Sequence, residues 1–332
     1  MANIHPVRAL RYTEKAGPIS ELATLPYDVI PAALEAEYKS RSPYNFAHVI
    51  LPQGDYAGAK ARLDGWVDSG IVARDTEAAI YVYEQTFPAP GSGETLVRRG
   101  FVALSDTEEY GETVYRHERT ISGPKEDRFR LLEATRVQFD SIFMLFPDET
   151  GAVEARLDSV CGGAPDLEYT DHEKTVHRLW RITDAGWIAA LQAEMAGEKL
   201  LIADGHHRYE TALRMGQAKT LMTFVSMRSK GLRSFATHRL VHGIEGFDAE
   251  AMLAKLPNVG EGLELKSPEG HVRIGIAVAG GEFHADIPAG PDELNVSVLQ
   301  DKVLAPVLGL TPDKVAAGGH LTYVKQLPAA LE

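Results

Sequence analysis

Apolar and polar residues follow two spacings along this chain, and each spacing predicts a set of elements. Runs rich in Val, Ile, Tyr and Phe, several of them alternating, indicate strands at residues 78–87, 96–104, 141–146, 200–203 and 221–227. Apolar residues three and four positions apart indicate amphipathic helices at residues 32–39, 56–69, 152–160 and 184–194. Pro and Gly between the first two strands predict a β-hairpin there.

The order of these elements predicts the fold class. Strands and helices mix without strict alternation, which indicates an α+β fold with a mixed sheet and flanking helices. Residues 1–241 form the predicted main domain, and residues 242–332 a smaller C-terminal lobe. In the lobe we expect a helix near 249–256, strands around Leu263, 272–278 and 282–287, and a helix at 298–308.

The most informative stretch is a strand, a tight turn and a helix at residues 198–216. The apolar run 200–203 is followed by Asp204–Gly205, and Tyr209, Ala212 and Leu213 then have helical spacing. Gly216 stands where a glycine ends many helices. The first turn of the predicted helix therefore carries His206, His207 and Arg208.

The start of a helix attracts phosphate, because its backbone N–H groups lack partners and carry the positive end of the helix dipole. Gly205 lets a ligand approach the backbone, and Arg208 can clamp phosphate oxygens. Two interpretations of Asp204 stay open: it caps the helix, or it acts on a magnesium ion or a reacting hydroxyl. We expect one of His206 and His207 to contact phosphate or substrate and the other to pack.

A second dense group of charges lies at residues 114–128, around a Ser-Gly-Pro turn that precedes a helix. One interpretation is a solvated turn with charge pairs four positions apart. In the functional interpretation His117, Lys125 and Arg128 contact phosphate, and Glu118 or Asp127 acts on a hydroxyl or a metal. Asp28, in the turn Pro26–Tyr27–Asp28, is either a plain turn residue or a further site residue.

The composition narrows the class of function. The net charge of −13 and the lack of a basic run argue against binding to nucleic acid. No apolar run is long enough to span a membrane, and the first residues do not form a secretory signal, so we expect a cytoplasmic protein. The single Cys161 suits a reducing compartment. The oligomeric state stays open.

Common nucleotide and metal motifs are missing. The chain has neither a GxGxxG sequence nor the Gly-Lys-Ser/Thr of a P-loop. His172 and His177 are five positions apart and would diverge by about 140° on a helix, so we predict no zinc site there. Adjacent His206 and His207 are equally unsuited to share one ion.

Several separated motifs resemble a known family. The string from Ala203 to Leu213, residues 25–30, and the stretches 117–120 and 123–128 are similar to DUF1015, a prokaryotic family of unknown function. Asp204–Arg208 reads Asp-Gly-His-His-Arg and resembles the phosphate-binding loop of the ParB/sulfiredoxin-like superfamily. Within that superfamily the five-residue sequence is most similar to that of the free-serine kinases. Sulfiredoxin differs because it has a cysteine at the position of His206.

This resemblance implies a ParB/sulfiredoxin-like core with a strand–turn–helix phosphate loop. It also implies a function in phosphoryl transfer. We expect a phosphotransferase that acts on a small hydroxyl-bearing metabolite, for example a free amino acid such as serine. ATP or ADP and Mg²⁺ would be the cofactors, with Asp204 near the metal. The general base stays unassigned among Glu118, Asp127, Asp204 and Glu210. The alternatives are a regulatory protein that binds a phosphorylated ligand without turnover, and a phosphoester or nucleotide hydrolase.

Overall fold

The computed structural model describes residues 2–89, 93–116, 124–233, 237–264, 266–291, 293–324 and 327–331. The chain divides into two compact units, Met1–Arg233 and Ser234–Glu332. Each unit has hydrophobic clusters of its own, so each is a folding unit with its own interior.

The N-terminal unit is built on a mixed sheet, which joins nine strands of its described residues in the order β6-β10-β7-β11-β5-β4-β9-β8, with β1 paired to β5. The pairs β6–β10 and β7–β11 are parallel and the others are antiparallel. The strands are β1 (Ile4–His5), β4 (Ile80–Pro88), β5 (Thr95–Asp106), β6 (Val114–Tyr115), β7 (Ile142–Phe146), β8 (Leu167–Thr170), β9 (Val176–Ile182), β10 (Leu200–Asp204) and β11 (Lys219–Ser226). The strands β2 (Leu10–Tyr12) and β3 (Val72–Arg74) pair separately.

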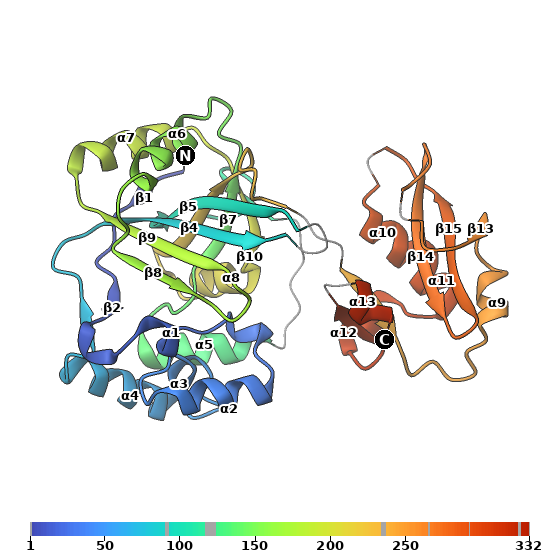
Figure 1. Cartoon of the computed structure of the whole chain (residues 1–332), viewed down its shortest axis with the longest axis horizontal. Coiled ribbons are helices and arrows are strands. Elements are labelled where there is room, and N and C mark those ends of the chain that lie inside the picture. Colours follow the sequence, from blue (N-terminus) through green and yellow to red (C-terminus); the bar gives the residue numbers. More distant parts are fainter. Residues whose placement is uncertain are drawn as a thin grey trace. The chain divides into compact units, whose positions relative to one another are not determined.

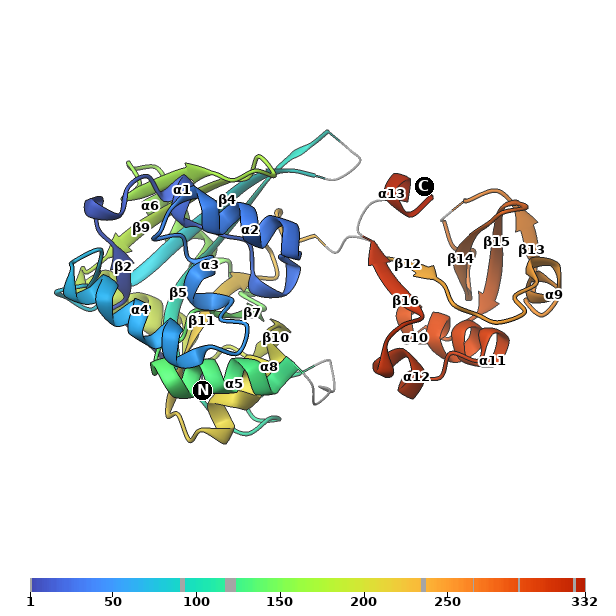
Figure 2. The ribbon, with the colours of Figure 1, turned by 90° about the horizontal axis from the view of Figure 1, so that it is seen from below.

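Helices flank the sheet on both sides (Figure 1). On one side lie α6 (Ala152–Cys161) and α7 (Ala185–Met195). On the other lie α1 (Ile19–Leu22), α2 (Ala32–Arg41), α3 (Ala47–Ile50), α4 (Tyr56–Asp68) and α5 (Pro124–Thr135). Short 3-10 turns cover Glu14–Ala16 and Tyr27–Val29. The helix α8 (His206–Arg214) follows β10 and packs beside α5 (Figure 2).

The two faces of the sheet are buried to different degrees. In β7, Ile142, Met144 and Phe146 are buried in the cluster that α6 and α7 complete, and Phe143 and Leu145 between them are only half-buried. The strand β11 alternates in the same way over most of its length. Mixed sheets can leave one face partly accessible. We call the half-buried face, which carries Phe143, the open face.

Most predicted elements of this unit are present. The hairpin β4–β5, the helix α4 and the strand–turn–helix unit β10–α8 lie where the hydrophobic pattern places them. The α+β class with a mixed sheet and flanking helices is confirmed. Strands β8 and β9 are additional to the prediction, and the residues between them, including His172, form a turn.

The C-terminal unit contains a three-stranded antiparallel sheet in the order β13-β15-β14. Its strands are β13 (Val259–Glu261), β14 (His271–Val278) and β15 (Gly281–Pro288), so Leu263 lies just after a strand and not within it. The helices are α9 (Ala249–Leu253), α10 (Asn295–Leu299), a π-helical turn (Gln300–Leu304), α11 (Ala305–Leu308), α12 (Pro312–Ala317) and α13 (Leu327–Leu331).

The boundary between the units lies before the predicted one at residue 241. The strand β12 (His238–Val241), which the sequence analysis places at the end of the main domain, pairs with β16 (Leu321–Val324) of the C-terminal unit. Pairing between residues so far apart in the sequence leaves no local pattern, so the apolar run alone could not assign β12 to its unit.

Candidate functional site

The turn between β10 and α8 has the geometry of an open helix start. Gly205 is the N-cap residue, with φ 93° and ψ 25°, and no side chain caps the helix. A Cβ atom on Gly205 would lie 3.0 Å from Cζ of Arg208. The helix ends in a Schellman motif, since the N–H groups of Gly216 and Gln217 donate to the carbonyls of Leu213 and Ala212.

Asp204 does not cap the helix, so that interpretation of the residue is wrong. Its carboxylate instead accepts a hydrogen bond from Nη2 of Arg208, and the side chain is 63% exposed. Nη1 of Arg208 donates to the carbonyl of Ser141, just before β7. The physical reason is competition: the guanidinium, one helical turn along, offers a charged donor that the backbone N–H groups do not match.

Arg128 is the fifth residue of α5, at the start of its second turn, and is buried, with 8% of its surface exposed. Its Nη2 donates to the carbonyl of Ile50 over 2.8 Å, and its Nε donates to Oδ2 of Asp127 over 2.9 Å. The hydroxyl of Tyr56 donates to the other oxygen of Asp127. The remaining Arg128 nitrogen, Nη1, is buried and has no hydrogen-bond partner among the residues that the structure describes. An unpaired buried donor costs about 1–3 kcal/mol, so this atom calls for an acceptor.

Arg128 and Arg208 line the same cavity, which has a volume of about 40 Å³. The other walls come from α5, the segment that follows it and Thr211 of α8. Such a volume holds a few water molecules. It therefore has room for one small anionic group, but not for the base and sugar of a nucleotide.

Three aspartates act electrostatically on this cavity. Asp140 lines it, and burial raises the pKa of the Asp140 carboxyl above its ordinary value. The two arginines lower that pKa, while Asp28 and Asp204 raise it further. The cavity is thus lined by two guanidinium groups and one carboxyl group, and two further carboxylates act on that carboxyl group.

Tyr27 joins the N-terminal motif to this group. The Cζ atom of Arg128 lies 4.1 Å from the ring centroid of Tyr27, a cation–π contact. Burial is the main cause of the raised pKa of Tyr27, and the charges of Arg128 and Arg208 both act on it. The structure thus brings together residues from the turn at 26–28, from α5 and from the turn at 204–208.

The remaining predicted site residues are placed as follows. His206 is buried, with 5% exposed, and His207 is half-buried. Asp127 is engaged by Arg128 and Tyr56, so its carboxylate already holds α5 to its neighbours. His117, Glu118 and the side chain of Lys125 lie outside the described residues. The catalytic roles of Asp204, His206, Glu118 and Asp127 stay predictions.

No group of three or more His, Cys, Asp or Glu side chains that could hold a metal ion occurs among the described residues. Magnesium, however, is often bound through one or two carboxylates together with substrate phosphates. Asp204 at the exposed rim fits such a shared site, whereas an all-protein metal cage does not fit the described part of this unit.

Sequence reasoning missed Asp140 and the polar residues of the open face. Asp140 immediately precedes a buried strand, and that position is the one signal that could have marked it as a residue at a sheet end. Arg98 and Arg99 are adjacent in β5 and therefore point to opposite faces of the sheet. Which arginine has a carboxylate partner depends on strand pairing, which the sequence pattern does not contain.

Comparisons with known proteins identify the family. No helix in the described ranges combines the length and the apolar character that crossing a membrane requires. Neither the curated proteins nor the solved structures include a match to this chain. The family described as "Protein of unknown function (DUF1015)" matches residues 4–303. Because this match covers most of the chain and includes the three motifs that meet at the cavity, the protein belongs to the DUF1015 family.

Proposed function

We propose that the protein binds a phosphoryl group between Arg128 and Arg208 and transfers it to a hydroxyl group of a small metabolite. The observation that carries this proposal is the buried Nη1 atom of Arg128, which lacks a partner although its residue lines a cavity. Phosphate oxygens are acceptors that suit guanidinium groups well. The likeness of Asp204–Arg208 to the phosphate loop of the free-serine kinases adds support.

In this proposal each residue has a defined task. Arg128, already oriented by Ile50 and Asp127, neutralises the terminal phosphoryl group of a nucleotide. The N–H groups at the start of α8 and the Arg208 guanidinium complete the cradle. Mg²⁺, shared between Asp204 and the nucleotide phosphates, would neutralise charge in the transition state.

The chemistry is a displacement at phosphorus. The hydroxyl oxygen of the acceptor forms a bond to the phosphorus atom, and the bond from phosphorus to the bridging oxygen of the nucleotide breaks. The nucleotide leaves with that electron pair, and one of the candidate bases, Glu118, Asp127, Asp204 or Glu210, takes up the hydroxyl proton. Exposure of Asp204 at the rim suits a residue that meets an entering substrate. A reaction of this kind, on a free metabolite, agrees with the cytoplasmic location expected from the sequence.

Phosphorus NMR tests the proposal directly. Purified protein is incubated with Mg²⁺, ATP or ADP, and a pool of amino acids and sugars. We expect a new phosphomonoester signal, which Asp204→Asn abolishes while the nucleotide signals still broaden. The matched control is Asp64→Asn, since Asp64 is also exposed and is also paired four positions away, with Lys60.

The phosphate cradle is tested with a second pair of variants on α5. Arg128→Gln should weaken nucleotide binding by at least about tenfold, because a charged hydrogen-bond donor is lost. Arg130→Gln, on the same helix and 57% exposed, should leave binding unchanged. Circular dichroism checks that both variants fold, and Arg128→Lys separates loss of charge from loss of the planar donor group.

Other results would replace the proposal. Release of inorganic phosphate that does not depend on any acceptor would indicate a hydrolase. Broadening of the nucleotide signals without turnover would indicate a binding protein. If neither broadening nor turnover occurs, the interpretation of the turn at 204–208 is wrong.

A further inference from the structure

Arg98 of β5 is a half-buried cation on the open face, and no acidic side chain among the described residues pairs with it. Its Nε and Nη2 atoms both donate to Oε1 of Gln85, over 3.1 and 2.6 Å. The rings of Phe87 and Phe143 lie 5.5 and 5.4 Å from its Cζ atom. The neighbouring Arg99, on the other face, is paired with both Glu84 and Asp158. Unlike Arg99, Arg98 is contacted by an amide group and by aromatic rings.

This arrangement leaves one donor of Arg98 directed to something outside the protein. A cation removed from water is unfavourable unless an anion pairs with it, and burial lowers the pKa of Arg98. Nη1 of Arg98 donates no hydrogen bond to a described residue, yet it is not among the sealed, unpartnered atoms of the unit. Nη1 therefore reaches solvent while the rest of the guanidinium is fixed in place.

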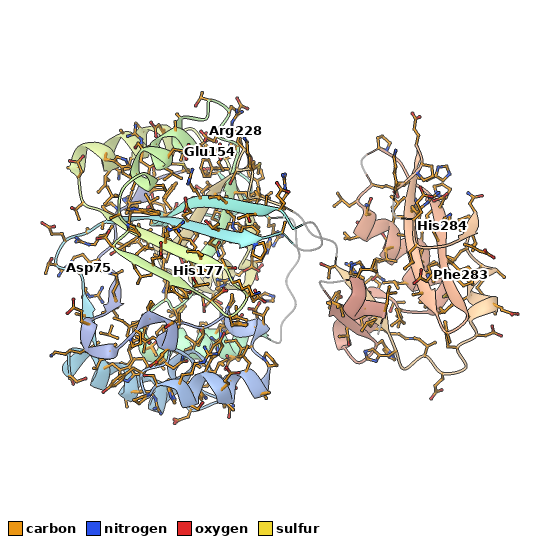
Figure 3. The ribbon with its side chains drawn as sticks, viewed as in Figure 1. Asp75, Glu154, His177, Arg228, Phe283 and His284 are labelled. Carbon is orange, nitrogen blue, oxygen red and sulfur yellow. The ribbon has the colours of Figure 1, made fainter. Side chains whose placement is uncertain are left out.

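A second polar group on the same face lies beside Arg98. His177 of β9 has two partners, the hydroxyl of Tyr83 at Nδ1 over 2.6 Å and Oδ2 of Asp171 at Nε2 over 3.0 Å. The ring of Tyr169 stacks on His177 at 4.6 Å. Figure 3 shows His177 on the side of the sheet nearer to helices α1 to α5, opposite to Glu154 and Arg228.

The partners of His177 determine how the Tyr83 hydroxyl is oriented. A carboxylate only accepts, so Nε2 carries the proton that is donated to Asp171, and Nδ1 accepts from Tyr83. The phenolic oxygen of Tyr83 then has free lone pairs. Tyr83 pairs with Gly100, two residues from Arg98 in β5, and the charge of Arg98 acts on its hydroxyl. A fixed donor and a fixed acceptor thus lie next to each other.

The Arg98 site adjoins the phosphate cavity. Phe143, whose ring contacts Arg98, is paired with Asp204 across strands β7 and β10. Adjacent strands are about 4.8 Å apart, and the carboxylate of Asp204 is bonded to Arg208. Phe143, which contacts Arg98, and Asp204, which pairs with Arg208, thus connect the two guanidinium groups through neighbouring residues.

We propose that Arg98 binds the carboxylate of a small acid, and that this acid is the acceptor whose hydroxyl group receives the phosphoryl group. The second half of this statement rests on the function proposed above, and the first half does not. The substrate class is then a hydroxy acid or a hydroxyl-bearing amino acid, whose hydroxyl or ammonium group can donate to the oxygen of Tyr83.

The test compares acids with their amides. Saturation-transfer NMR titrations use acetate, lactate and serine, each beside its neutral-headed amide, with wild type, Arg98→Gln and Arg98→Lys. We expect wild type to bind at least one acid about tenfold more tightly than its amide. In Arg98→Gln this preference should fall below about threefold, and Arg98→Lys should be intermediate, because the charge stays but the planar fork is lost.

Control measurements separate this inference from the proposed function. Arg74→Gln, an exposed arginine of β3, should keep the full preference for acids. Broadening of the inorganic phosphate signal should survive in Arg98→Gln and be lost in Arg128→Gln. If acids bind through Arg98 but no phosphoryl transfer occurs, the proposed function fails and the carboxylate site stands.

Two results would overturn the inference. In the first, wild type binds every acid no more tightly than the corresponding amide. This result does not depend on the folding of any variant. The other is Arg98→Gln with an unchanged preference for acids. Transfer to an acceptor with the same KM in wild type and Arg98→Gln would leave the proposed function standing and remove Arg98 from it.

Discussion

At the scale of single residues, the charge state of Asp140 decides how well the cavity holds an anion. Its carboxyl faces Arg128 and Arg208, with Asp28 and Asp204 also acting on it. An ionised Asp140 neutralises the arginines and repels an incoming anion. A protonated Asp140 leaves the arginines free to bind it. The raised pKa of this carboxyl therefore links anion binding to pH.

We predict that Asp140→Asn binds sulfate more tightly than wild type at neutral pH, on the order of tenfold. A unit charge a few ångströms away, at an effective dielectric constant of about 20, contributes more than about 1 kcal/mol. The affinity of wild type for sulfate should rise as the pH falls, because Asp140 takes up a proton. Asp140→Asn should lack this pH-dependent increase. Calorimetric titration with sulfate between about pH 5 and pH 8 measures both effects.

The same carboxyl has a consequence for stability. A raised pKa in the folded state means that the stability it contributes is present at low pH and is lost as the pH rises through that pKa. Asp140→Asn should therefore unfold at a higher urea concentration than wild type at neutral pH. Asp64→Asn, an exposed control, should change neither the urea concentration of unfolding nor the affinity for sulfate. Equal sulfate affinities for wild type and Asp140→Asn would contradict the assignment of Asp140 to the cavity.

The residues that sequence reasoning found and those it missed differ in one respect. Arg128 and Arg208 each lie within the first five residues of a helix, so a local pattern was enough to select them. Arg98 and Asp140 owe their surroundings to strands and helices that are distant in the sequence. Selecting them requires the strand pairing, which hydrophobic spacing does not supply.

At the scale of elements, the turn from β10 to α8 depends on one backbone conformation. Gly205 has a positive φ, which is unfavourable for residues with a Cβ atom by about 1–2 kcal/mol. A methyl group there would also press against the Arg208 guanidinium at 3.0 Å. Both effects would change the position of Arg208, which lines the cavity.

Gly205→Ala should accordingly lower the free energy of unfolding by about 1–2 kcal/mol and weaken sulfate binding. Gly65→Ala is the matched control, since Gly65 lies inside α4 with nothing within 4 Å of the added methyl group. That control should be more stable than wild type, by about 0.4–1 kcal/mol. Urea unfolding followed by tryptophan fluorescence compares the three proteins. A Gly205→Ala variant as stable as wild type would show that another residue can adopt this turn.

Element prediction succeeded where the pattern is local and repeated. The helix α4, the hairpin β4–β5 and the unit β10–α8 all combine a clear period with Gly, Pro or Asp at their ends. Glu168 and Thr170 alternate with apolar residues in β8. In β9, His177, Arg178 and Arg181 interrupt the apolar residues without a regular period. The turn between the strands is rich in charged residues, so no uninterrupted apolar run marks either strand. β9 pairs with β4 and β8 pairs with β9, and the pairing of β9 with β4 joins residues that are distant in the sequence.

At the scale of the whole molecule, all three tryptophans, Trp66, Trp180 and Trp187, are in the N-terminal unit. Tryptophan fluorescence therefore reports the unfolding of that unit, whereas circular dichroism reports both. The C-terminal unit has a separate apolar cluster that includes Ile287, which is 2% exposed.

Ile287→Ala should destabilise the C-terminal unit by about 2–5 kcal/mol, because a large buried side chain is removed. The transition seen by circular dichroism should then begin at a lower urea concentration, with the fluorescence transition unchanged. Val296→Ala, at a position 53% exposed, should leave both curves as they are. A fluorescence transition that moves with Ile287→Ala would mean that the two units unfold together.

The two faces of the central sheet differ in how strongly folding constrains their side chains. Most positions on the face covered by α6 and α7 are apolar and buried, so a change of volume there is costly, although the ion pairs of Arg99 lie on the same face. On the open face Arg98, Tyr83 and Gln85 are only half-buried, so replacing one of them should cost less in folding. Under the function and the acid site proposed above, relatives that share this scaffold would change substrate at Arg98, Tyr83 or Gln85, while the cavity between Arg128 and Arg208 stays as it is.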